Sequence, residues 1–93
     1  MDTGEARKVL GEHLGKYRPL PYADLVARIE KVETLEIARG GNRPWQLEFL
    51  FYWDSEPGGN VRVIGSIDDG GFRAFFPLSD SFIKGPRGEF IGE

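Results

Sequence analysis

Residues 45–53 read WQLEFLFYW, and this stretch decides the fold of the chain. Its even positions include the polar residues Gln46 and Glu48, whereas its odd positions are all large and apolar: Trp45, Leu47, Phe49, Phe51 and Trp53. Alternation with a period of two is typical of a strand with one buried face. The sequence therefore predicts that residues 45–53 form the central strand of an antiparallel sheet.

Size and composition indicate a single domain over residues 1–93. The chain carries 2 Trp, 3 Tyr and 7 Phe residues, and these can form a substantial core because each aromatic side chain buries roughly 150–250 Å². It has no cysteine, which excludes disulfides and thiolate metal sites and fits a reducing compartment. The sequence has no apolar run of signal-peptide or membrane-spanning length. We therefore expect a cytoplasmic protein.

Two segments within residues 1–31 have the periodicity of helices. Residues 3–16 are predicted to form the first helix. Side chains that can share one face recur there at spacings of three and four: Val9, Leu10, His13, Leu14 and Tyr17. A second helix is predicted to start near Pro21, a residue favoured in a first turn. Its apolar stripe consists of Tyr22, Leu25, Val26 and Ile29. We expect this second helix to pack on the sheet.

Clusters of Gly, Pro, Asn and Asp divide residues 32–77 into four predicted strands. The clusters are residues 40–44, 54–60 and 68–71, and their composition is typical of hairpin turns. The strands are then residues 32–39, 45–53, 61–67 and 72–77. The predicted fold class is α+β: one or two N-terminal helices packed on a four-stranded antiparallel meander sheet, with residues 78–93 as a C-terminal segment folded back.

If each hairpin closes symmetrically, the register of the sheet follows. On the face toward the helix, Phe49 lies over Gly65 and Ala74, and the neighbouring rows are Ile37, Leu47, Ile67 and Phe72, then Phe51, Val63 and Phe76. The opposite face has one apolar row, Leu50, Ile64 and Phe75, bordered by Tyr52 and Arg62. The tail, residues 78–93, is the candidate cover for this row.

The last part of the chain, residues 67–93, reads IDDGGFRAFFPLSDSFIKGPRGEFIGE. It resembles the C-terminal end of a set of small bacterial proteins of uncharacterised function. The resemblance implies a bacterial source, and it assigns no catalytic or binding residue.

A second candidate site lies at one end of the predicted meander. There, Asp68 and Asp69 would be close to Arg39 and Arg43. Adjacent carboxylates can bind a divalent cation or serve as acid and base. However, Asp and Gly are also what a hairpin loop selects, so an ion-pair cluster and a small polar ligand site both fit the sequence.

The other end of the meander gathers acidic residues, namely Glu33, Asp54, Glu56 and Asp80. Such a group fits a cation site or a docking patch for a basic partner, although short acidic loops are mostly solvated surface. The phosphate-binding fingerprints of nucleotide-binding proteins are absent from the sequence. Residues 32–93 carry 6 basic and 10 acidic side chains, which argues against a nucleic-acid partner.

These features favour a non-catalytic protein-interaction module or homo-oligomer. The interaction surface would be Leu50, Tyr52, Arg62, Ile64 and Phe75. One alternative is a small-molecule or ion-binding protein, or an enzyme, that uses the Asp68 and Asp69 loop end. Another is a small acidic inhibitor or immunity-type protein. No catalytic residue, metal ligand, cofactor or membrane partner is predicted.

Overall fold

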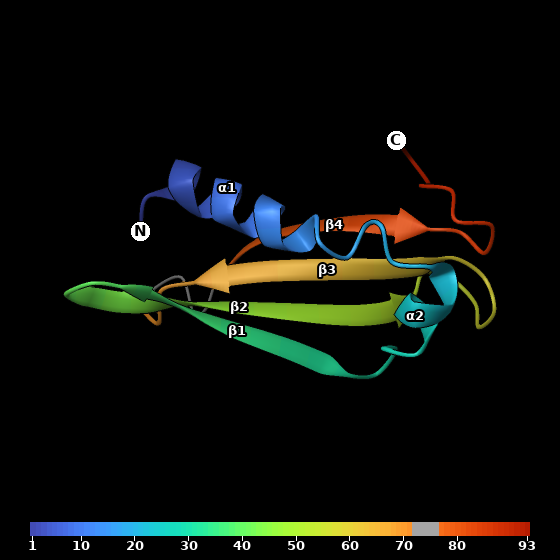
Figure 1. Cartoon of the computed structure of the whole chain (residues 1–93), viewed down its shortest axis with the longest axis horizontal. Coiled ribbons are helices and arrows are strands. Elements are labelled where there is room, and N and C mark those ends of the chain that lie inside the picture. The colour runs from blue at the N-terminus through green and yellow to red at the C-terminus, as the bar shows by residue number, and fades with distance from the viewer. Residues whose placement is uncertain (72–76) are drawn as a thin grey trace.

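The computed structural model describes residues 1–71 and 77–93. In this part of the chain, helices α1 (Thr3–Leu14) and α2 (Tyr22–Val26) precede strands β1 (Val32–Arg39), β2 (Asn42–Trp53), β3 (Val61–Asp68) and β4 (Leu78–Lys84). The strands form one antiparallel sheet in the order β1-β2-β3-β4 (Figure 1). The α+β meander expected from the sequence is confirmed.

Strand β2 and helix α1 supply much of the core. The odd positions of β2 are buried as predicted: Trp45, Leu47, Phe49 and Phe51 are 4%, 1%, 3% and 1% exposed. Helix α1 begins after Asp2, whose side chain accepts a hydrogen bond from the Glu5 N–H group, and such a cap stabilises a helix start. Its buried side chains recur every fourth residue and so form one face: Ala6, Leu10 and Leu14.

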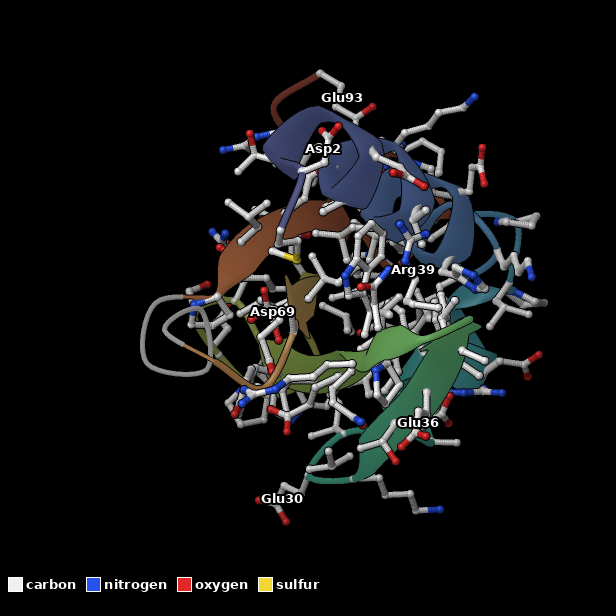
Figure 2. The ribbon with its side chains drawn as sticks, turned by 90° about the vertical axis from the view of Figure 1, so that its left-hand side faces the viewer. Asp2, Glu30, Glu36, Arg39, Asp69 and Glu93 are labelled. Atoms are coloured by element: carbon white, nitrogen blue, oxygen red, sulfur yellow. The ribbon has the colours of Figure 1, made fainter. Side chains whose placement is uncertain are left out.

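Helix α1 covers most of one face of the sheet, whereas the second helix, which was expected to pack on the sheet, makes a smaller contact with β3 and buries Leu25. Viewed from one end of the molecule, α1 lies along one side of the curved sheet (Figure 2). It packs over β3 and β4, where Gly65 permits close approach: a Cβ atom there would lie 3.0 Å from Cδ1 of Leu10. Helix α2 has only 5 residues and is fixed near the β2–β3 loop, where the Tyr22 hydroxyl donates to the Gly59 carbonyl at 2.7 Å.

The register between β2 and β3 is as predicted. Leu47 pairs with Ile67, Phe49 with Gly65, and Leu50 with Ile64. The ring of Phe49 does lie over Gly65, because a Cβ atom at Gly65 would be 3.0 Å from Cε1 of Phe49. Ala74, the other predicted neighbour of this ring, lies outside the described residues.

The register between β1 and β2 differs from the symmetric prediction by two residues. The partner of Leu47 is Leu35, not Ile37 as predicted. The reason is a tighter turn: Arg39 pairs with Asn42, and only Gly40 and Gly41 separate the two strands. Gly40 has a φ of 63°, which glycine adopts without steric cost. Because the shift is even over Val32–Ile37, the side chains of these residues stay on their predicted faces.

The strand that pairs with β3 is residues 78–84, so their assignment to a covering tail was wrong. Ile67 pairs with Leu78, and Val61 with Lys84. The predicted strand at residues 72–77 falls, except for Pro77, on residues that the structure does not describe. Lys84 faces the core side and is 6% exposed. Its ammonium nonetheless has partners, because it donates to the carbonyls of Arg18 and Leu20.

The remaining C-terminal segment folds back, as expected, but toward the helices. Residues 85–88 form a turn closed by a 2.9 Å backbone hydrogen bond. Phe90 then packs edge-on against the core residue Phe82, with 5.9 Å between ring centroids. Arg18 binds both carboxylate oxygens of Glu93, at 3.0 and 2.7 Å. The segment is therefore anchored to the α1–α2 loop and to the α1 side of the sheet.

Candidate interaction surfaces

The face of the sheet opposite α1 carries an apolar patch. The pairing places Val32, Leu50, Ile64 and Ser81 in one row across the four strands, and Tyr52, Arg62 and Ile83 in the next. We define the outer patch by its apolar members: Val32, Leu50, Tyr52, Ile64 and Ile83. Neither helix of the described chain lies over this face, and the C-terminal segment is anchored elsewhere.

Members of the outer patch are accessible to different degrees. Val32 is 56% exposed and Tyr52 is 46% exposed, while the other three are half-buried. The charge beside them is already paired, because the Arg62 guanidinium donates to Asp54 at 3.0 Å. The patch therefore offers apolar area with no unpaired cation at its centre.

The outer patch contains most of the predicted interaction residues. Leu50, Tyr52, Arg62 and Ile64 are neighbours on one face. Phe75 lies outside the described residues, and the β4 residue beside Ile64 is Ser81. Sequence reasoning missed Val32 and Ile83, because Val32 joins the row through the two-residue shift of β1 and Ile83 through the different fourth strand.

The arginine and aspartate cluster lies around an open pocket of about 380 Å³. Arg39, Arg43 and Asp69 all line it. Figure 2 looks onto this end and labels Arg39, beneath α1, and Asp69, across from it. Asp68 does not line the pocket, and its side chain instead accepts the Gly70 N–H group at 2.9 Å. Three of the four predicted residues are thus brought together.

Charges around this pocket are largely satisfied by other partners. Arg39 donates to Glu5 of α1 at 2.9 Å and stacks 3.8 Å above the Trp45 ring. Asp69 accepts the Gly71 N–H group, which lowers its pKa, and lies 3.5 Å from the Met1 ammonium. Within residues 1–71 and 77–93, no ion pair joins either arginine to Asp68 or Asp69. The arrangement is typical of a structural ion-pair cluster.

A second groove, of about 370 Å³, lies between α1 and β1 on the core side of the sheet. We call it the α1–β1 groove, and it is lined by His13, Lys16, Tyr17, Glu33, Thr34, Leu35 and Phe49. Sequence reasoning did not anticipate this groove. The available signal was Glu33, a charged residue on the apolar face of its strand.

Glu33 in this groove is held from two sides. The Tyr17 hydroxyl donates to one carboxylate oxygen at 2.6 Å, and Arg28 donates to the other at 3.1 Å. The Tyr17 ring packs on Phe49, with 5.0 Å between centroids. Burial first, and then the hydrogen bond to Glu33, raise the pKa of Tyr17 well above its ordinary value of 10.0. Burial also lowers the pKa of His13.

The four carboxylates expected to gather at one end do not form one site. Glu33 and Asp54 are each bound by an arginine. Asp80 pairs with Gly65 in the middle of β3, and its side chain accepts the Ser81 N–H group at 2.8 Å. Among the residues with described positions, no group of three His, Cys, Asp or Glu side chains is arranged to hold a metal ion.

Comparisons with protein-family models, with curated proteins and with solved structures gave no match to this chain. Neither described helix is long and apolar enough to cross a membrane.

Proposed function

We propose that this chain is a non-catalytic interaction module that self-associates through the outer patch. The observation that carries the proposal is the row of Val32, Leu50 and Ile64, which neither described helix covers and which continues into Tyr52 and Ile83. Contiguous exposed apolar patches on single chains are frequently functional. Tyrosine is also a residue type enriched at the centres of interfaces. A bacterial, cytoplasmic setting is part of the proposal, supported by the resemblance of residues 67–93 and the lack of cysteine.

Charge placement supports a second copy of the chain as the occupant. Arg62 is already paired with Asp54, so two patches can meet without burying an unpaired cation, which would be costly. The acidic residues of this face, Glu36 and Glu48, lie toward the other end of the strands. A two-fold axis that passes through the patch perpendicular to the strands places the acidic ends of the two copies at opposite ends of the dimer.

The size of the outer patch sets the expected strength of self-association. Stable interfaces bury about 800 Å² on each partner, whereas five side chains, three of them half-buried, expose less than that. The association is therefore expected to be weak, with a dimer forming only toward the high end of the accessible concentration range.

Sedimentation equilibrium from low micromolar to near-millimolar concentration tests the proposal. We expect wild type to dimerise and Leu50→Lys to stay monomeric. Gln46→Lys is the matched control, because it lies on the same strand and face, adds the same charge, and is outside the patch. A wild type that remains monomeric throughout excludes self-association. Equal dimerisation of Leu50→Lys excludes the outer patch.

A further inference from the structure

Strand β1 is an open edge of the sheet. In the part of the chain that the structure describes, it pairs with β2 alone. Its pairing is regular from Val32 to Ile37, and the register shifts only between Ile37 and Arg39. An edge strand presents a row of unpaired backbone N–H and C=O groups toward solvent, which is a template for a further strand.

The α1–β1 groove lies next to this edge. Its apolar part is formed by Leu35, which is 40% exposed, and Phe49. Its wall comes from the end of α1 and the residues just after it, where His13, Lys16 and Tyr17 line the groove. Successive side chains of a strand point to opposite faces. A strand added to β1 would therefore direct every second side chain into the groove.

The charge of the groove indicates what one of those side chains should be. Both carboxylate oxygens of Glu33 are already bound, one by Tyr17 and one by Arg28. Lys16 takes part in no ion pair among the described residues. The unbalanced charge of the groove is thus positive, and a carboxylate is its complement.

We propose that the β1 edge and the α1–β1 groove together bind an extended peptide as a fifth strand. One of its inward side chains is apolar and covers Leu35, and another is acidic and pairs with Lys16. Backbone hydrogen bonds supply affinity in this mode of recognition, and the alternate side chains supply specificity. The proposal goes beyond self-association, because it uses the other face of the sheet and a different partner.

A second copy of the chain does not supply the free acidic side chain that the groove requires. If its β1 strand were added to this edge, the groove-facing side chains would be Glu33, Leu35 and Ile37. The only carboxylate in that set is already held by Tyr17 and Arg28 of its own chain. A separate acidic, partly apolar segment fits the groove better.

A phage-displayed library of random peptides, selected on wild type and counter-selected on Leu35→Lys, supplies the probes. We expect the enriched peptides to alternate apolar residues and to contain an acidic residue. Synthetic copies are then titrated by fluorescence anisotropy. Backbone N–H groups of an added strand point alternately toward β1 and toward solvent. N-methylation of the set that points toward β1 should weaken binding about tenfold or more, because its hydrogen bonds to β1 are lost. N-methylation of the other set should leave the affinity unchanged.

Charge reversal tests the contact with Lys16. Lys16→Glu should weaken binding of the acidic peptide about fivefold, and a peptide with Lys in place of its acidic residue should regain affinity for this variant. Lys8→Glu is the matched control, since it is an exposed residue of α1 that does not line the groove. An unchanged affinity in Lys16→Glu, or no effect of either N-methyl set, overturns the proposal.

The peptide-binding proposal is also overturned if selection enriches no peptide above the Leu35→Lys background. It is overturned as well if wild type dimerises and Leu35→Lys abolishes this dimer, because the β1 edge would then pair with a second copy. These variants distinguish peptide binding from self-association. Leu50→Lys should bind the peptides as wild type does, and Leu35→Lys should still dimerise through the outer patch.

Discussion

Replacing Lys84 with Met tests whether the buried ammonium holds the α1–α2 loop against the sheet. Lys84 is 6% exposed, and its Nζ lies 2.6 Å from the Arg18 carbonyl and 2.7 Å from the Leu20 carbonyl. It also lies 5.1 Å from the centroid of the Phe90 ring. Methionine fills similar volume but provides no donor, so both carbonyls lose their partner.

The expected loss of stability follows from these contacts. A hydrogen bond to a charged group contributes about 1.5–3 kcal/mol, so two such bonds give roughly 3–6 kcal/mol. Removing the ammonium also removes the free-energy cost of desolvating it, which is itself several kcal/mol and offsets part of this loss. We therefore expect Lys84→Met to lower the free energy of unfolding by about 2 kcal/mol. For a chain of this size, that corresponds to a fall in Tm of roughly 8–16 °C.

Urea unfolding followed by tryptophan fluorescence measures this change, because Trp45 is buried in the core. Lys8→Met is the control: it removes an exposed ammonium from α1 and introduces a good helix former, so its effect should stay within about 0.5 kcal/mol. If Lys84→Met also stays within about 0.5 kcal/mol, the two hydrogen bonds do not stabilise the fold and the reasoning is refuted.

Two further predictions concern the core and the Tyr17 contact. Gly65→Val should lower the free energy of unfolding by about 1–3 kcal/mol because its side chain overlaps the Phe49 ring. Gly41→Ala is the control: a Cβ atom at this position has no atom within 4 Å, so the free energy of unfolding should change little. Equal urea midpoints for the two variants would contradict the close packing of Phe49 on Gly65. Folding raises the pKa of Tyr17, so the unfolded chain loses this proton first and stability should fall as pH rises above about 10. Tyr17→Phe, which lacks the hydroxyl bound to Glu33, should lose less stability in urea unfolding between neutral pH and pH 11, and parallel curves would contradict the assignment.

The candidate surfaces were predictable where they depended on β2 and β3. These residues share a face because the alternation of apolar and polar side chains fixes the register of this hairpin: Leu50, Tyr52, Arg62 and Ile64. Val32 and Ile83 were not predictable, since their places depend on a turn conformation and on which segment pairs with β3.

Other contacts of the site depend on residues far apart in the chain. Arg39 lines the same pocket as Asp69, as expected, but its ion-pair partner is Glu5 of α1. Tyr17 and Glu33, which both line the α1–β1 groove, likewise form a hydrogen bond across 16 positions of the sequence. The spacing of residues along the sequence does not predict either contact.

The α+β class, the buried face of β2 and its pairing with β3 could all be predicted from the amino-acid sequence. These features follow from the period of two and from hairpin closure, which are properties of neighbouring residues. Three features depended on long-range packing: α1 covers the sheet, residues 78–84 pair with β3, and neither described helix lies over the outer face. Leu78–Lys84 carries an inward lysine, which a strand tolerates only because two carbonyls of the α1–α2 loop bind its ammonium. That compensation comes from residues more than 60 positions away, where local pattern gives no information.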